Sequence, residues 1–359
     1  MRVVVLTQGE RGGGAEFVAR TWAGCLAERG HEVSFVVTSA PAGESADGVT
    51  YLRSRRSRPW SLVGSFRRHV ALFRPDVVLS LLTFPNLVAL LAAGPAGFRV
   101  PVVISERNVP SMLLRQQGLS QRVQLFLARR LYRRAEAVVA ISHPVAADLV
   151  AAFSVDPDRC LVVPNPATAK LTGGATAPAP RGERRGDELT LVLPCRLVPQ
   201  KDPLLVTSVA RILADRGRAV SVLVFGAGPL EPDLVRAADA AGVPLRIAGW
   251  DEEWFRNCPP GSVVCLPSYV EGFGNVLVEA AAANVPVVAM GTALGVADAV
   301  VPGVTGHLAA TRDPEEFADL VEAADRLPAW DVPGWLRRFS PEVSTDILER
   351  ILRRTTGKK

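Results

Sequence analysis

Residues 263–290 have the composition of one strand–loop–helix–strand unit, and this unit constrains the fold more than any other stretch. Val263-Val-Cys-Leu-Pro267 is short, apolar and β-branched, which predicts a buried strand. The stretch Glu271-Gly-Phe-Gly-Asn-Val-Leu-Val-Glu279 then supplies a glycine-containing loop and the start of a helix, and Val285–Met290 predicts the next strand. This order fits a right-handed βαβ crossover, which belongs to a parallel sheet covered by helices.

The same alternation of predicted strands and helices recurs along the chain in two halves. The predicted strands are Val3–Leu6, Val33–Thr38, Val77–Leu82, Val100–Ile104 and Ala137–Ile141 in the first half, and Leu189–Leu193, Val220–Phe225, Leu245–Ala248, Val263–Leu266 and Val285–Met290 in the second. We therefore predict an α/β fold with two Rossmann-like, doubly wound domains that face a cleft.

We place the domain boundaries by composition. Residues 1–167 form the first predicted domain and 189–339 the second, and the stretch 168–188 between them is rich in Ala, Pro, Gly and charge, as surface linkers are. We expect a last helix, within 340–359, to cross back onto the first domain.

Composition narrows the class of protein. The 359 residues are 48% hydrophobic and 21% charged, as in a globular protein, and five scattered cysteines show no metal-like spacing. No secretory signal precedes the first predicted strand, so we expect a cytoplasmic protein. Val77 to Phe98 carries no charge over 22 residues, but Pro85-Asn86 divides it, so we predict a strand and a core helix instead of a membrane span.

The first half is basic. Residues 1–170 hold 21 Lys and Arg against 12 Asp and Glu, and Gln121–Arg134 alternates arginines with apolar residues as a basic amphipathic helix does. Such a helix either packs on the core with a solvated basic face or forms a surface patch for an anionic membrane or a lipid diphosphate. Peripheral contact with the inner face of a membrane is therefore left open. No nucleic-acid-binding motif is present, so we expect no nucleic-acid partner.

Three segments suit a nucleotide diphosphate. Gly12-Gly-Gly-Ala-Glu16 follows the first strand, Arg196 to Lys201 follows the strand that opens the second half, and Phe225-Gly-Ala-Gly-Pro229 ends the next. Glycines admit close backbone approach, while Arg and Lys bind phosphate oxygens. Lys201 is one of only four lysines, and we predict that Asp202 caps the helix behind it. The dinucleotide fingerprint Gly-x-Gly-x-x-Gly is missing, which argues against a nicotinamide enzyme.

Several of these segments together resemble glycosyltransferase family 4. They are Gly13-Gly-Ala-Glu16, Ser105-Glu-Arg-Asn108, Val163-Pro-Asn165, Arg196-Leu-Val-Pro-Gln-Lys201-Asp202, Gly226-Ala-Gly-Pro229, Pro267-Ser to Glu279, and Val301-Pro-Gly-Val-Thr-Gly-His-Leu308. The resemblance covers nearly the whole chain. It implies the GT-B architecture and a retaining transfer of a hexose or N-acetylhexosamine from a nucleotide-sugar, with UDP the expected nucleotide. It implies no required metal and no cofactor.

The resemblance also implies roles for residues on the donor side. Arg196 and Lys201 would stabilise the leaving diphosphate, Glu271 would hold the donor sugar, and Glu279 would hold the ribose. The other expected donor contacts are Gly13, Gly14, Gly226, Trp250, Phe273, Gly274, Asn275 and Val276.

On the acceptor side we expect Glu106, Arg107, Asn108 and His143. Many members of the family carry a histidine where this chain has Arg107. The sequence Ser105-Glu-Arg-Asn108 resembles the subset that acts on lipid-linked or polysaccharide acceptors. Arg107 could bind the acceptor, bind the donor or brace Glu106.

Two other functions stay open at this point. One is a nucleotide-sugar epimerase on the same fold, and the other is a non-catalytic sugar-nucleotide binding module. The sequence specifies neither the sugar nor the accepting hydroxyl, whether in a lipid-linked, polysaccharide or natural-product acceptor.

Overall fold

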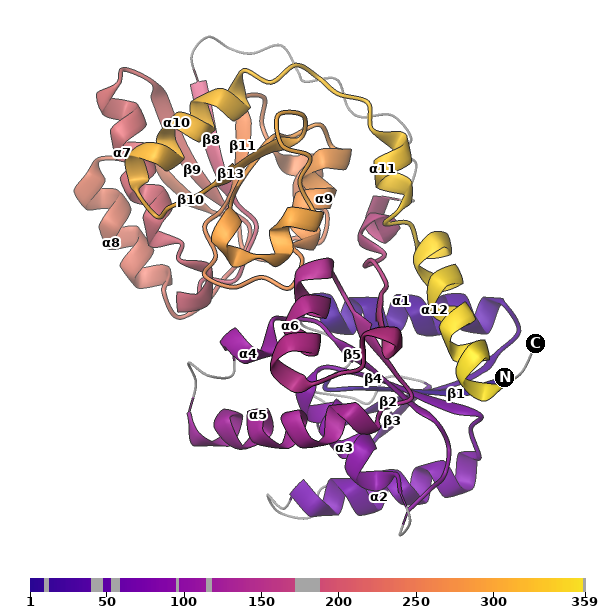
Figure 1. The fold of residues 1–359 in the computed structure, drawn as a ribbon. Coiled ribbons are helices and arrows are strands. Elements are labelled where there is room, and N and C mark those ends of the chain that lie inside the picture. Colours follow the sequence, from indigo (N-terminus) through magenta and orange to yellow (C-terminus); the bar gives the residue numbers. More distant parts are fainter. Residues whose placement is uncertain are drawn as a thin grey trace. The chain divides into compact units, whose positions relative to one another are not determined.

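A computed structural model describes residues 1–9, 13–39, 48–52, 59–94, 97–113, 118–171 and 188–357. The chain divides into two compact units, one made of Met1–Pro166 with Arg338–Lys359 and the other of Ala167–Arg337. Each unit is a parallel sheet covered by helices (Figure 1), so the predicted pair of doubly wound α/β parts is confirmed.

The sheet of the first unit has the order β3-β2-β1-β4-β5-β6-β7 among the described residues. Its strands are β1 (Arg2–Thr7), β2 (Glu32–Val37), β3 (Val49–Tyr51), β4 (Val77–Leu81), β5 (Val102–Glu106), β6 (Ala137–Ala140) and β7 (Cys160–Val162). The helices are α1 (Gly14–Glu28), α2 (Pro59–Phe73), α3 (Thr83–Ala92), α4 (Pro110–Leu113), α5 (Leu119–Leu131), α6 (His143–Phe153) and α12 (Pro341–Thr356), with short 3₁₀ turns η2 (Tyr132–Arg134) and η3 (Pro157–Arg159).

The sheet of the second unit has the order β10-β9-β8-β11-β12-β13 in the described part of the chain. Its strands are β8 (Glu188–Leu193), β9 (Ala219–Val224), β10 (Leu245–Ile247), β11 (Ser262–Leu266), β12 (Val287–Met290) and β13 (Gly306–Ala309). The helices are α7 (Leu204–Asp215), α8 (Glu231–Ala241), α9 (Asn275–Ala282), α10 (Pro314–Asp325) and α11 (Pro333–Arg337), and the 3₁₀ turns are η4 (Ala167–Leu171), η5 (Pro199–Lys201), η6 (Trp254–Asn257), η7 (Gly291–Ala293) and η8 (Gly295–Asp298).

Predicted and observed element bounds differ for local reasons. The strand expected at 100–104 runs from Val102 to Glu106, since Pro101 has no N–H group to donate to the ladder. The basic helix begins at Leu119 and gives way after Leu131 to the tighter turn η2. The short strands β3, β7 and β13 were not predicted.

The stretch Val77–Phe98 forms a strand and then a helix, as predicted. All residues of β4 are buried, and α3 is buried along most of its length. Within the described ranges no helix combines the length and the apolar character that a membrane crossing requires.

The predicted linker 168–188 is wrong at both of its ends. Residues Ala167–Leu171 form η4, which packs on α9 inside the second unit, and Glu188 already belongs to β8. Residues 172–187, the rest of that prediction, lie outside the described residues.

The C-terminal helix α12 packs on the core of the first unit. Leu348 and Leu352 are fully buried in one cluster with Trp22 of α1 and Leu79 of β4. The same face supplies a hydrogen bond, because Nε1 of Trp22 donates to Oγ of Ser344 over 2.9 Å.

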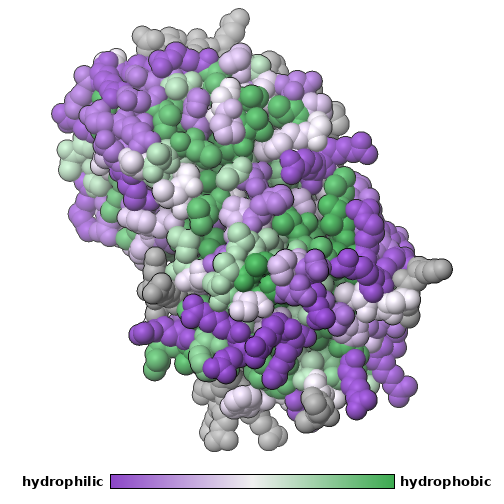
Figure 2. Space-filling model, in the orientation of Figure 1, coloured by the Kyte–Doolittle hydropathy of each residue, from purple (hydrophilic) through white to green (hydrophobic). Residues whose placement is uncertain are grey.

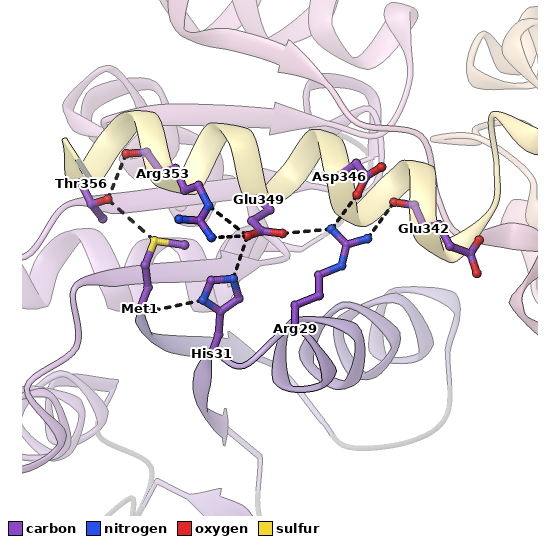
Figure 3. A network of polar contacts seen from close by, with 8 residues as sticks. All are labelled: Met1, Arg29, His31, Glu342, Asp346, Glu349, Arg353 and Thr356. Carbon is purple, nitrogen blue, oxygen red and sulfur yellow. Dashed lines mark hydrogen bonds and ion pairs between the residues drawn. The ribbon is translucent and has the colours of Figure 1, made fainter. Parts of the chain in front are cut away.

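A polar network runs along one side of this helix (Figure 3). The carboxylate of Glu349 accepts hydrogen bonds from Arg29, His31 and Arg353 at 2.9, 2.9 and 2.8 Å. His31 is held in turn by the amino group of Met1, which lies 3.0 Å from its Nδ1. Burial acts to raise the pKa of Glu349, but the hydrogen bonds from its three neighbours outweigh it and lower that pKa to about 2.

We expect Glu349→Gln to lower the free energy of unfolding at pH 7 by about 2 kcal/mol, because hydrogen bonds to a charged group are lost. Since the folded-state pKa of Glu349 is below the unfolded value of about 4.3, this stability is present above that value. It is lost as the pH falls towards 2. Urea denaturation at pH 7 and pH 3 measures it, and a difference between variant and wild type that does not shrink at pH 3 would contradict the assignment. Glu342→Gln on the same helix is the control.

Candidate active site

The second unit has a topological switch point between β8 and β11. The chain leaves β8 for β9 on one side and later returns to β11 on the other. In open α/β sheets, ligands bind outside the carboxyl ends of the strands at such a reversal. The segments that leave these two strands are residues 194–203 and 267–274, and they hold five of the predicted donor-side residues: Arg196, Lys201, Glu271, Phe273 and Gly274.

An ion pair between Lys201 and Glu271 joins these two segments. Nζ of Lys201 donates to Oε1 of Glu271, and the same oxygen accepts from Oγ of Ser268 over 2.7 Å. Both charged side chains are largely buried, with 15% and 9% of their surfaces exposed. The pair therefore holds a cation and a carboxylate in fixed positions at the sheet edge.

The same two segments are also joined through their backbones. Nε2 of Gln200 donates to the carbonyl of Val270 over 2.8 Å, and the amide of Tyr269 donates to the carbonyl of Gln200 over 2.9 Å. The guanidinium of Arg312 lies 3.7 Å over the ring of Tyr269 and donates to the carbonyl of Pro267. These contacts rigidify the backbone around Lys201 and Glu271.

Asp202 does not cap the following helix, so that prediction is wrong. The N-cap of α7 is Pro203, with no side-chain hydrogen bond, and Asp202 has a φ of 44°. Its carboxylate pairs with Arg312 instead. A charged partner outcompeted the local cap, since charge-assisted hydrogen bonds are the stronger ones.

Arg196 is exposed in the same segment, and the part of the chain that the structure describes provides no ion-pair partner for it. Gly226, just after β9, lies beside Arg196, because its backbone packs against the backbone of Cys195 and Arg196. A Cβ on Gly226 would meet the carbonyl oxygen of Cys195 at 1.9 Å. Glycine at this position therefore permits the close approach of the two segments.

Glu279 is buried in the second turn of α9. Its Oε2 accepts from Nε1 of Trp254 over 2.8 Å, and its Oε1 lies 3.3 Å from Nζ of Lys170. Burial raises the pKa of Glu279, while Lys170 and Trp254 oppose that shift. Each carboxylate oxygen can accept two hydrogen bonds, so each oxygen of Glu279 keeps the capacity to accept one more.

The start of α9 is shaped by Gly274, its N-cap, which has a φ of 96° that favours glycine. Asn275 and Val276 occupy the first helical positions, and Phe273 is buried. Trp250, the remaining predicted donor residue of this unit, is exposed beyond β10. The N-terminus of this helix directs backbone N–H groups outward at the switch point, which favours an anion.

The predicted residues of the first unit are spread along its sheet edge. Gly13 and Gly14 open α1, and His143 is the exposed first residue of α6. Asn108 is half-buried just after β5. Glu106, at the end of β5, points into the protein.

The carboxylate of Glu106 accepts from Tyr132, from Nδ2 of Asn86 over 3.2 Å and from Oγ1 of Thr83 over 3.3 Å. Burial raises its pKa to about 7 against these hydrogen bonds. Glu106 is thus turned away from solvent, in a position to support the backbone on which Arg107 stands.

Two residues of the site were missed by sequence analysis, namely Lys170 and Trp254. Lys170 lay in the predicted linker, yet its scarcity was a usable signal, because the chain has only four lysines. Trp254 gave no such signal, since its role depends on a hydrogen bond to a residue 25 positions away.

All five cysteines are free thiols. Among the described residues, no group of three or more His, Cys, Asp or Glu side chains is arranged to bind a metal ion. The side-chain cations at this sheet edge are Arg196 and Lys201 at the segment after β8, and Lys170 at Glu279.

Comparisons with solved structures identify the architecture. HepE from Anabaena, solved with UDP and glucose, superposes with a TM-score of 0.74 at 18% identity, covering 99% of this chain and 100% of that one. The lipopolysaccharide outer core galactosyltransferase WaaB gives a TM-score of 0.78 at 16% identity, covering 99% of each chain. The fold is the GT-B architecture of glycosyltransferases, as expected.

Family models identify the sequence. Residues 12–169 match the model "Glycosyltransferase Family 4", and residues 188–324 match "Glycosyl transferases group 1". The two matches together cover most of the chain, which belongs to glycosyltransferase family 4.

Curated relatives match parts of the chain. A D-inositol 3-phosphate glycosyltransferase from Frankia alni is 34% identical over 201 residues, 51% of this chain and 48% of that protein. An N-acetylgalactosamine-N,N'-diacetylbacillosaminyl-diphospho-undecaprenol 4-alpha-N-acetylgalactosaminyltransferase from Campylobacter jejuni is 25% identical over 215 residues, 59% of this chain and 57% of that protein. The chain thus spans about half the length of the curated relatives it matches.

Proposed function

We propose that this protein is a retaining glycosyltransferase that moves a hexose or N-acetylhexosamine from a UDP-sugar to a lipid-linked, polysaccharide or natural-product acceptor. The observation that carries the proposal is the Lys201–Glu271 pair at the switch point, with exposed Arg196 in the same segment. The UDP bound to HepE and the lipid-diphosphate substrate in the name of the Campylobacter relative support the donor and acceptor classes.

The proposed roles follow from the charge that the reaction develops. When the bond between the anomeric carbon and the diphosphate oxygen breaks, negative charge grows on the diphosphate. Arg196 and Lys201 would stabilise that charge, each preorganised donor contributing about 2.7–4 kcal/mol. Glu271 would accept hydrogen bonds from the donor sugar, and Glu279 from the ribose.

The remaining donor-side assignments concern backbone groups and one aromatic ring. We assign amides near Phe273, Gly274, Asn275 and Val276 to the sugar or phosphate, and those of Gly13 and Gly14 to phosphate. Gly226 would let the backbone approach the base, and exposed Trp250 would lie on the same side of the donor.

The test is a UDP-release assay with purified protein over a panel of UDP-sugars and acceptors, with EDTA present because we propose that no metal is required. Acceptor-dependent UDP release, with a product that keeps the anomeric configuration of the donor by NMR, supports the proposal. A changed sugar without acceptor would indicate an epimerase instead. Tight UDP binding with no turnover on any acceptor would indicate a binding module.

We further propose that the protein works at the cytoplasmic face of a membrane, which it contacts through α5. Leu125, Ala128 and Leu131 form the buried stripe of this helix. A second apolar stripe faces solvent, with Leu119, Val123 and Phe126 exposed by 78%, 50% and 56%. Their spacing of four and three residues places them on one face.

Charge surrounds that exposed stripe. The arginines of α5 and η2 are Arg122, Arg129, Arg130, Arg133 and Arg134, and no Asp or Glu lies between Gly118 and Ala135. Figure 2 shows hydrophilic side chains interrupted by apolar ones where α5 lies in Figure 1. Apolar residues flanked by arginine on one helix face suit an anionic bilayer surface.

We expect replacement of Leu119, Val123 and Phe126 by Gln to reduce binding to vesicles that contain anionic lipid at least tenfold in a sedimentation assay. Burial of these side chains in the interface supplies the lost free energy. Val235→Gln, which removes an exposed apolar residue from α8, is the matched control. Failure of the wild-type protein to sediment with such vesicles at low salt would refute the membrane contact.

A further inference from the structure

Arg107 is a buried cation with few partners. Its side chain follows β5 directly, and the residue is only 5% exposed. Nη1 donates to Oγ of Ser105 over 3.2 Å, and the guanidinium lies 5.0 Å over the ring of Trp22. Of the other nitrogens, Nε and Nη2 are buried and have no hydrogen-bond partner among the described residues.

The guanidinium of Arg107 is also not hydrogen-bonded to a carboxylate among the described residues. Glu106 is its neighbour in sequence, but the carboxylate of Glu106 accepts from Asn86, Thr83 and Tyr132. Burial lowers the pKa of Arg107 to about 9, with the charge of Glu106 opposing that shift, so the guanidinium remains charged at pH 7. A buried charge without a partner is costly, and an anion that arrives from outside the chain would offset that cost.

Arg107 lies at the carboxyl edge of the first sheet, near its switch point, where open α/β sheets bind ligands. The switch point of this sheet lies between β1 and β4, and β5 is the next strand. Leu81 pairs with Ser105, and Leu6 pairs with Ser80, so Thr7, Leu81 and Ser105 share one face at the carboxyl edge. Trp22 of α1 covers the same face.

A second unpartnered polar group lies on that face. Oγ1 of Thr7 is fully buried and has no hydrogen-bond partner in the described residues. The hydroxyl of Thr7 ends β1, and the guanidinium of Arg107, with two unpartnered nitrogens, follows β5, so that only β4 lies between them in the sheet. Both groups are donors of the type that bind phosphate or carboxylate oxygens. An apolar packing role would leave all of these donors unsatisfied, which proteins avoid.

We propose that Arg107 and Thr7 form a subsite of the first unit for an anionic group of a substrate, a phosphate or a carboxylate. The inference rests on the proposed function for the identity of that substrate. The group would come from a phosphate-bearing or carboxylate-bearing acceptor, and the shared chemistry is an oxyanion.

The first test needs no turnover, so its outcome is independent of the proposed function. Thermal shift with inorganic phosphate is measured in an Arg196→Met/Lys201→Met background, which silences the cations of the second unit. We expect phosphate to raise Tm in this background and the rise to disappear when Arg107→Met is added. An equal rise with and without Arg107→Met would overturn the subsite.

The same variants separate anion binding from packing. Removing an unpaired buried charge should leave Tm without phosphate unchanged or higher, whereas a packing role over Trp22 predicts a lower Tm. Arg107→Lys keeps the charge and should keep part of the phosphate response. A lower Tm for Arg107→Met together with an unchanged phosphate response would assign Arg107 to the core.

Transfer assays then identify the source of the anion. If the acceptor supplies it, Arg107→Met raises KM for a phosphate-bearing acceptor about 10- to 100-fold and leaves KM for UDP-glucose near its wild-type value. A loss that falls on UDP-glucuronate and spares UDP-glucose would overturn the assignment to the acceptor. Equal effects on charged and neutral substrates would overturn the proposal.

Discussion

Replacement of Lys201 by Met should lower kcat for sugar transfer by 10²- to 10³-fold. Lys201 is the largely buried cation of the proposed donor site, and one preorganised donor to a developing oxyanion contributes about 2.7–4 kcal/mol to transition-state stabilisation. The effect should fall mainly on kcat, because charge on the diphosphate grows as the glycosidic bond breaks. Steady-state UDP release with saturating donor measures it.

Stability must be separated from catalysis in this variant. Lys201→Met leaves the carboxylate of Glu271 buried, with Ser268 as its one remaining side-chain partner among the described residues, which lowers stability as well. The double variant Lys201→Met/Glu271→Gln removes both charges and should recover stability without recovering kcat. Arg196→Met is the matched control, since exposed Arg196 should cost kcat without a change in Tm. A Lys201→Met enzyme with kcat within threefold of wild type would exclude this role for Lys201.

The sequence carried most of the fold because its strands are buried on both faces. Continuous apolar runs such as Val77–Leu81 predict strands of a parallel sheet that helices cover on both faces. Glycines mark the loops that follow several of these strands. The positions of Arg196, Lys201, Glu271 and Glu279 at one switch point follow from that topology alone.

Pairings between distant segments were beyond reach of the sequence. Lys201 and Glu271 are 70 residues apart, and nothing in the sequence near either residue indicates that they form a hydrogen-bonded ion pair. Asp202 shows the same limit, since the local cap rule was sound but Arg312, 110 positions away, offered a stronger partner. Lys170 was not predicted as a site residue because the composition of residues 168–188 is that of a linker. Composition describes the whole stretch, whereas the contact with Glu279 depends on one residue.

Burial changed the interpretation of Glu106 for a related reason. A Glu-Arg-Asn sequence behind a strand suggests three polar groups facing a ligand. Alternation along the strand instead sends Glu106 inward to Tyr132 and Asn86, and leaves Arg107 on the other face with open donor positions. The sequence could place this segment at the sheet edge but could not say which side chain was satisfied.

Replacement of Glu279 by Gln should weaken UDP binding by about 10- to 100-fold. In the proposed complex, the carboxylate accepts from the ribose hydroxyls, and hydrogen bonds to a charged acceptor contribute roughly 1.5–3 kcal/mol. Gln fills the same volume and can still accept from Trp254, so the loss is mainly that of charge. Isothermal titration with UDP measures the change in Kd.

A ligand-based control makes this prediction specific. Wild type should bind 2′-deoxy- or 3′-deoxy-UDP more weakly than UDP, and Glu279→Gln should bind the matching pair with nearly equal Kd. This is a double-mutant cycle between one side chain and one hydroxyl, so a general disturbance of the site cancels. The same deoxy penalty in both proteins would show that Glu279 does not contact the ribose.

Lys170 is expected to control the protonation of Glu279, because its ammonium group lies beside that carboxylate. Burial raises the pKa of Glu279, and Lys170 is the largest of the influences that oppose the shift. We therefore expect Lys170→Met to raise that pKa further and to make UDP binding fall as the pH drops, since a protonated carboxyl accepts less well. Titration of UDP affinity between pH 8 and pH 5 in wild type and Lys170→Met tests the coupling, and identical pH profiles would assign Lys170 to structure alone.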